Sequence, residues 1–122
     1  MKYENLEHRL IDFAALVVKI VESMPDTRAA NHLAGQLLRS GTSPALNYGE
    51  ARAGESIRDF LHKMRIALKE LRETFVCLKV IYKTKLFSSE NDIMYSLKEC
   101  NELISIFVAS CKTVQKKANK DS

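Results

Sequence analysis

The stretch IRDFLHKMRIALKELRETFVCLKVIY, residues 57–82, decides the fold of this chain. Its apolar side chains recur at alternating steps of four and three residues, which places them on one face of a helix that packs against other helices. They are Ile57, Leu61, Met64, Leu68, Leu71, Phe75, Leu78 and Tyr82. Ser56 precedes the stretch, and Asp59 lies three residues after Ser56, a pairing typical of the first turn of a helix.

The same periodicity predicts three more helices. The first runs to about Ser23 on the stripe Leu6, Leu10, Phe13, Val17, Ile20 and Met24. Pro25 ends it, and Asp26 or Thr27 caps a second helix that runs through Leu33, Leu37 and Leu38. The last opens at Ser88 and Ser89, on the stripe Ile93, Leu97, Cys100, Ile104, Phe107, Cys111 and Val114.

Four helices with short connections predict an all-α fold, an antiparallel up-down-up-down four-helix bundle. A chain of 122 residues has room for one core, so residues 1–122 form a single domain with a frayed tail at about 116–122. No apolar run approaches the length of a membrane span, which predicts a cytoplasmic protein without membrane contact. Three cysteines without C-x-x-C spacing argue against a disulfide framework or a zinc site.

Glycine and proline interrupt the pattern before residue 57, in GTSPALNYGEARAGES, residues 41–56. If the second helix ended at Gly41, Ser43 would cap a new helix with Pro44 in its first turn. If the helix continued, Pro44 would lose the bond to residue 40 and bend it. The abundance of small residues favours a continuous second helix, bent at Pro44 and packed closely against its neighbours, with the turn at Ala53 and Gly54.

Two helices carry apolar side chains beyond their core stripes. Beside the first stripe lie Ile11, Ala14, Val18 and Val21, and Leu103, Ile106 and Ala109 widen the face of the last helix. These residues indicate either a broad core or burial against another subunit.

The excess positive charge of the chain is concentrated in residues 50–87, with nine basic and five acidic side chains, whereas the segments on either side are balanced. Arg58, Arg65, Arg72 and Lys79 follow one another at steps of seven, along roughly 30 Å of helix. Lys69 and Lys83 lie on the other flank, and Arg52 and Lys63 add charge near the start of the helix. Such a row could follow a phosphate backbone, or its cations could pair with acids of an adjacent helix or subunit.

No constellation of residues predicts catalysis or a cofactor. Asp59 and His62 form a single imperfect D-x-x-H step, whereas a di-iron bundle needs Glu-x-x-His on two helices. Neither a Ser-His-Asp set nor a glycine-rich phosphate loop is visible. We therefore expect a protein that is not an enzyme and that has no metal, cofactor or catalytic residue.

Residues 43–74 carry a resemblance to a known family. The run SPALNYGEARAGESIRDFLHKMRIALKELRET is similar to the signature of the bacterial four-helix bundle proteins, the 23S rRNA intervening sequence protein family. The shared elements are Ser43, Asn47, Tyr48, Glu50, Ala51, Ser56, Asp59, Phe60, Ile66, Ala67, Leu71, Glu73 and Thr74. Some relatives have Ile-Ala-Glu-Gly after the asparagine, so Tyr48 to Ala51 resemble the N-Y-x-E-A subgroup.

The resemblance implies a bundle whose second helix contains the proline, assembled into ring-like homo-oligomers, typically pentamers. Diversity-generating retroelement accessory proteins share this architecture and are expected to bind nucleic acid through basic surfaces. No established biochemical activity follows from the resemblance. The motif residues Ser43, Pro44, Asn47, Tyr48, Glu50, Asp59 and Phe60 are expected to be structural, with Asn47 and Glu50 tying the second helix to the third or to a neighbouring subunit.

Two functional hypotheses follow. In the first, an oligomeric bundle binds RNA or DNA through its basic row. In the second, a ring-like scaffold binds another protein, binds no nucleic acid, and uses its arginines to satisfy acids.

Overall fold

The described residues fold into four α-helices, as the sequence predicted. In the computed structural model, which describes the backbone of residues 3–121 and the side chains of residues 5–120, the helices are α1 (Tyr3–Glu22), α2 (Arg28–Arg52), α3 (Ile57–Thr84) and α4 (Glu90–Asp121). The all-α four-helix bundle is thereby confirmed.

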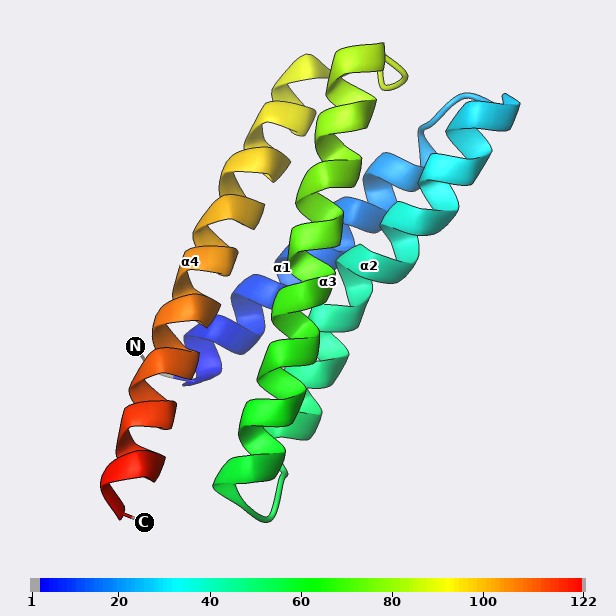
Figure 1. Cartoon of the computed structure of the whole chain (residues 1–122). Helices are drawn as coiled ribbons and strands as arrows, with labels where there is room; N and C mark the ends of the chain where they lie inside the picture. The colour runs from blue at the N-terminus through cyan, green and yellow to red at the C-terminus, as the bar shows by residue number, and fades with distance from the viewer. Residues whose placement is uncertain (1–2, 122) are drawn as a thin grey trace.

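Each helix packs against the one that follows it, and α1 also contacts α4. Successive helices run in alternating directions, with α1 beginning beside the C-terminal half of α4 and ending beside the start of α2 (Figure 1). Because α3 packs against both α2 and α4, it has two buried flanks and one outward face.

Short polar side chains fix where the helices begin. The Thr27 Oγ1 accepts a hydrogen bond from the Ala30 backbone N–H at 3.2 Å, and the Ser56 Oγ accepts one from the Asp59 N–H at 3.1 Å. The Ser89 Oγ accepts one from the Asp92 N–H at 3.3 Å. These bonds satisfy N–H groups that have no partner within the helix.

The second helix continues through Pro44 to Arg52, and the turn lies at Ala53 and Gly54, as predicted. Pro44 itself is buried. The bend at Pro44 stays a prediction.

Close packing between α1 and α2 depends on one glycine. A Cβ atom added at Gly41 would lie 2.7 Å from Cγ2 of Val17. At Gly35 and Gly49, by contrast, an added Cβ would meet nothing within 4 Å. The expected close approach is therefore specific to Gly41 among these three.

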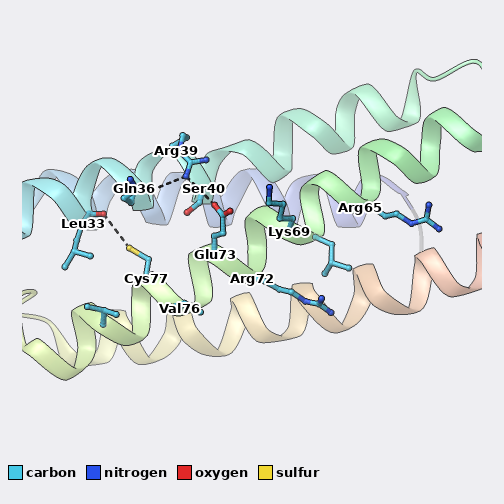
Figure 2. Close-up of a pocket in the computed structure, with 12 residues that line it drawn as sticks. Leu33, Gln36, Arg39, Ser40, Arg65, Lys69, Arg72, Glu73, Val76 and Cys77 are labelled. Carbon is cyan, nitrogen blue, oxygen red and sulfur yellow. Dashed lines mark hydrogen bonds and ion pairs between the residues drawn. The ribbon is translucent and has the colours of Figure 1, made fainter.

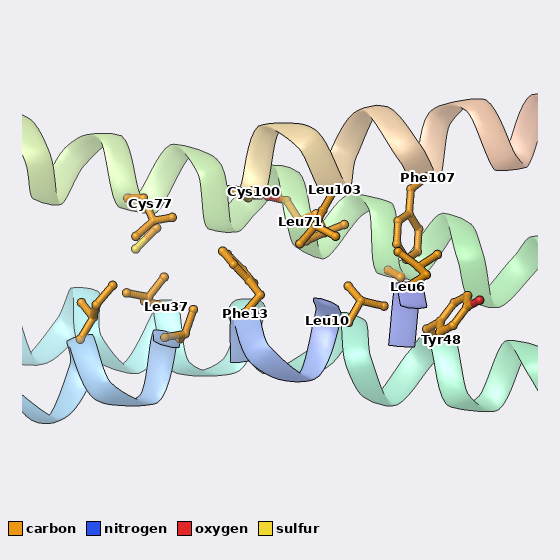
Figure 3. Close-up of a cluster of buried hydrophobic side chains, with 14 of the residues drawn as sticks. Leu6, Leu10, Phe13, Leu37, Tyr48, Leu71, Cys77, Cys100, Leu103 and Phe107 are labelled. Atoms are coloured by element: carbon orange, nitrogen blue, oxygen red, sulfur yellow. Dashed lines mark hydrogen bonds between the residues drawn. The ribbon is translucent and has the colours of Figure 1, made fainter. Parts of the chain in front are cut away.

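The core joins all four helices (Figure 3). The predicted stripe of α1 is buried from Leu6 to Ile20. Tyr48 of α2 is completely buried, with its ring edge-on to that of Phe107 at a centroid distance of 6.0 Å.

The buried face of α3 differs from the predicted stripe. Ile57 and Tyr82, at the two ends of that stripe, are 41% and 39% exposed, whereas Ala67, Thr74, Cys77 and Ile81 are buried. The reason is the packing of α3 against two helices, which turns part of its buried surface toward α2. Cys77, which the predicted stripe does not include, donates a hydrogen bond from Sγ to the Leu33 carbonyl at 3.6 Å.

The predicted frayed tail is helical where the structure describes it. Helix α4 continues through residues 116–121, and Ser122 lies outside the described residues. None of the helices in the described part of the chain combines the length and the apolar character needed to cross a membrane.

Candidate nucleic-acid interface

Seven of the eight predicted basic site residues have exposed side chains, and Lys63 is half-buried. Helix α3 places four of them at steps of seven residues along one side. We call these four the α3 row: Arg58, Arg65, Arg72 and Lys79. Figure 2 shows Arg65 and Arg72 on the side of α3 away from α2.

Two of the predicted residues have acidic partners and do not belong with the row. The Arg52 Nη1 lies 3.1 Å from the Glu7 Oε2, which ties α2 to α1. The Lys63 Nζ lies 2.9 Å from the Glu50 Oε2, which ties α3 to α2. For these two cations the pairing hypothesis was correct.

The α3 row lacks such partners. Within the part of the chain that the structure describes, no carboxylate lies within 4.0 Å of a charged nitrogen of the row. The Arg65 Nη2 instead donates to the amide oxygen of Gln115 at 2.7 Å, and the Lys79 Nζ lies 4.7 Å from the centre of the Phe75 ring. The guanidinium and ammonium charges of the row are therefore not neutralised by any carboxylate among the described side chains.

Two acids of α3 lie toward α2. Glu70 and Glu73 both receive Arg39 of α2, at 3.1 and 3.3 Å. On the far side of the bundle, Glu99 and Glu102 of α4 both receive Arg9 of α1, at 2.6 and 3.4 Å. These four carboxylates thus pair with arginines of α1 and α2 rather than with the cations of the α3 row.

Helix α4 adds cations that the sequence analysis did not select. The bond between Arg65 and Gln115 marks the flank of α4 that faces the row. Lys112 lies one turn before Gln115, and Lys116 follows Lys112 by one turn. Lys98 lies two heptads before Lys112. All three lysines are exposed. We call them the α4 row: Lys98, Lys112 and Lys116.

The signal for the α4 row was present in the sequence but was hidden by the charge balance of residues 88–122, which hold five basic and five acidic side chains. Two of those acids, Glu99 and Glu102, pair with Arg9 of α1, although Glu102 also lies one turn after Lys98. Charge counted by helix flank rather than by segment would have found the lysines.

A shallow groove of about 850 Å³ runs over the outward face of α3 beside α2 (Figure 2). Its lining includes Arg65 and Arg72, together with the aliphatic side chains of Val76 and Val80. Lys69 lines the same groove, so its predicted place on the other flank of α3 was wrong; it follows Arg65 by one turn and shares its face. Val76 is 60% exposed, so the basic face also carries an apolar surface.

Several family-motif residues make contacts within the bundle, and their structural role stays a prediction. The Asn47 Nδ2 donates to the Ser43 carbonyl and hydroxyl, at 3.1 and 2.8 Å, so Asn47 stabilises its own helix rather than tying α2 to α3. Glu50 does reach α3, through Lys63. Phe60 is half-buried and packs against the core.

The remaining candidates show no activated chemistry. Burial, with a smaller contribution from Glu99, raises the pKa of the Cys100 thiol to about 12, and burial also raises the pKa of Cys77 and Cys111. A reactive cysteine needs the opposite shift. Asp59 and His62 are both exposed, and no three His, Cys, Asp or Glu side chains converge as metal ligands in the described chain.

The sequence model of the 23S rRNA-intervening sequence proteins matches residues 6–109. The chain belongs to this family. The resemblance seen in residues 43–74 is thereby confirmed for most of the chain, including the α3 row. Among curated proteins, none matches the chain.

A solved structure agrees with membership of the 23S rRNA-intervening sequence protein family. This chain is similar to the crystal structure, at 1.70 Å, of a protein of unknown function from the S23 ribosomal protein family of Bacteroides thetaiotaomicron VPI-5482. The two chains share 27% identity with a TM-score of 0.83, over 92% of this chain and 99% of that one. Lys112 and Lys116 lie beyond the residues that the family's sequence model matches.

Proposed function

We propose that this protein is a non-enzymatic, cytoplasmic homo-oligomer that binds RNA or DNA through the α3 row. One observation carries the proposal. The exposed cations of the α3 row have no acidic partner in the described chain, whereas Arg9, Arg39, Arg52 and Lys63 are each paired with a carboxylate of another helix.

Unpaired cations at steps of ~10 Å along a rigid helix suit a polyanion. Each phosphate that they neutralise releases condensed counterions, so the binding is favourable and depends on salt. Contacts of this kind carry no direct sequence information. If the chain assembles, every subunit repeats the row, and simultaneous contacts raise the affinity further.

The test is the affinity for a fluorescein-labelled nucleic acid, measured by anisotropy between 50 and 200 mM salt. For about six phosphate contacts, the association constant should fall roughly a thousandfold across this range. The double substitution Arg65→Glu and Arg72→Glu should weaken binding further at every salt concentration. Binding that does not change with salt would show that the α3 row does not act through phosphates.

A matched control changes the same number of charges elsewhere. Lys19 and Arg28 are exposed on α1 and at the start of α2, with no carboxylate within 4.0 Å in the described chain. Lys19→Glu with Arg28→Glu should therefore retain most of the affinity. If both double variants lost the same affinity for nucleic acid, the net charge of the protein alone would explain the loss, and the α3 row would not be a specific binding site.

A second candidate function, a ring-like scaffold for another protein, is favoured by apolar surface on α1 and α2. The Arg52–Glu7 pair marks the flanks on which these helices face each other. On α1, steps of four and three residues after Glu7 lead to further residues on the same flank. On α2, steps of seven residues back from Arg52 do the same. We call this surface the α1–α2 apolar seam: Ile11, Ala14, Val18, Leu38 and Ala45.

The two candidates differ in what the purified protein contains and in what Arg65→Glu does. If the protein is a scaffold, the purified oligomer should contain no nucleic acid, measured by absorbance at 260 and 280 nm. Arg65→Glu should then disturb assembly or stability. The binding protein requires nucleic acid that high salt removes, with assembly unchanged in the variant.

A further inference from the structure

We infer that the basic face holds a double-stranded rather than a single-stranded nucleic acid, with the α3 row and the α4 row contacting phosphates of opposite strands. The inference rests on the proposed function. It adds the class of nucleic acid and assigns Lys98, Lys112 and Lys116 to the binding face.

The register between the rows comes from the hydrogen bond of Arg65 to Gln115. Because α3 and α4 run in opposite directions (Figure 1), each step forward in α3 is a step back in α4. Lys112 is then level with Leu68, between Arg65 and Arg72, and Lys98 is level with Tyr82. The two rows therefore run antiparallel and overlap along the seam between the helices.

Two lines of cations side by side match what a duplex presents, since a phosphate strand flanks each side of its grooves. The axes of packed helices lie ~8–10 Å apart, so the rows are held at a fixed separation by the bundle. From Arg58 to Lys79 the α3 row extends ~31 Å, close to one turn of a duplex at ~34–36 Å. The expected site is therefore roughly ten base pairs long.

The face lacks the aromatic surface that single strands need. Proteins that bind single strands stack successive bases on aromatic rings along a basic groove. Phe75, the aromatic residue beside the row, is half-buried and has the Lys79 ammonium 4.7 Å from its ring centre. The exposed apolar side chains in the groove are the valines at 76 and 80, and the exposed Tyr82 and Tyr95 lie only at one end of the helix pair.

The test uses the wild-type protein and four fluorescein-labelled probes of one sequence: a 20-base-pair RNA duplex, the corresponding DNA duplex, and one unstructured strand of each. At equal salt, a duplex should bind at least tenfold more tightly than its own strand. The RNA and DNA arms identify which duplex is preferred, and a preference for either supports the inference.

The α4 row is tested by the double substitution Lys112→Glu and Lys116→Glu. It should weaken duplex binding at least tenfold and strand binding several-fold less, while Lys19→Glu with Arg28→Glu leaves the duplex preference unchanged. Circular dichroism should show that the variants retain their helices.

Three outcomes would overturn the inference. A strand that binds as tightly as its duplex, or duplex binding that is unaffected by Lys112→Glu with Lys116→Glu, contradicts the inference and leaves the proposed function standing. If no probe binds at low salt, the proposed function fails together with it.

Discussion

Gly41 occupies the closest approach between α1 and α2. An alanine Cβ there would lie 2.7 and 2.9 Å from the two methyl groups of Val17, whose side chain is itself completely buried. Valine is branched at Cβ and cannot swing its methyls away freely. Gly41→Ala should therefore lower the free energy of unfolding by ~1–3 kcal/mol, measured by urea unfolding.

The matched control has the opposite sign. Gly35 lies in the same helix, with ordinary backbone angles and open space around an added Cβ. Gly35→Ala should raise the free energy of unfolding by ~0.5–1 kcal/mol, because glycine is a poor helix former. If both alanines changed stability in the same direction, close packing at Gly41 would be refuted.

The three cysteines should differ in reactivity according to their burial. Thiolate is the reactive form, and burial raises the pKa of Cys100 to about 12. At pH 8, iodoacetamide should modify the half-buried Cys111 first and Cys100 last, as read by mass spectrometry of digested protein. In denaturant the three rates should converge, and rapid labelling of native Cys100 would contradict its burial.

The same shift has a consequence for stability. Because the folded pKa lies above the ordinary value of 9.0, the unfolded thiol releases its proton first as pH rises. The contribution of Cys100 to stability is complete below about pH 9 and declines between pH 9 and about 12.

At the scale of the helix, the start of α3 depends on one hydroxyl. The Ser56 Oγ accepts the Asp59 N–H, and replacement by alanine leaves that donor to water. Ser56→Ala should lower the free energy of unfolding by ~1 kcal/mol, whereas Ser56→Gly should cost only a few tenths.

Ser105→Ala is the control for this prediction. The Ser105 hydroxyl is exposed and donates to the Asn101 carbonyl within α4, so its loss should change the chemical-denaturation midpoint little. An equal effect at both serines would mean that capping does not determine the stability of α3.

Helix positions could be predicted from the sequence because their causes are local. The heptad spacing of α3 and the serine before it need no other helix to be interpreted. The buried side of α3 could not be read in this way: Thr74 and Cys77 are buried because α2 covers them, with the Thr74 hydroxyl donating to that of Ser40 at 2.9 Å.

The candidate site was predictable to a similar extent. Heptad spacing identified the α3 row, but whether a cation is paired depends on which helix faces it. Arg52 and Lys63 are paired because α1 and α2 present Glu7 and Glu50 to them. The α4 row was missed for the same reason, since two of the acids that balance its charge in the sequence, Glu99 and Glu102, pair with Arg9 of α1 in the structure.

At the scale of the whole molecule, some cations pair with an acid of another helix and others have no acidic partner among the described residues. Pairs such as Arg9 with Glu99 connect helices that are distant in sequence and neutralise each other. The seam between α3 and α4 keeps cations without acidic partners among the described residues. Helices α1 and α2, on another side, carry the α1–α2 apolar seam. The α3–α4 seam and the α1–α2 apolar seam thus lie on different sides of the bundle, so the proposed binding of nucleic acid leaves the apolar seam available to a second copy.

This separation makes the proposed assembly testable on its own. Ile11 and Val18 are 50% and 41% exposed, so Ile11→Glu with Val18→Glu should preserve the fold and disrupt contacts with another copy. Light scattering should give a multiple of 13.9 kDa for the wild type and about 13.9 kDa for this variant. Leu46→Glu is the control. Leu46 is 71% exposed, but it follows Arg39 by seven residues and so lies on the flank of α2 toward α3. Its substitution should leave the mass of the assembly unchanged. A monomeric wild type, or a double variant that still assembles, would show that the apolar seam is not the contact between subunits.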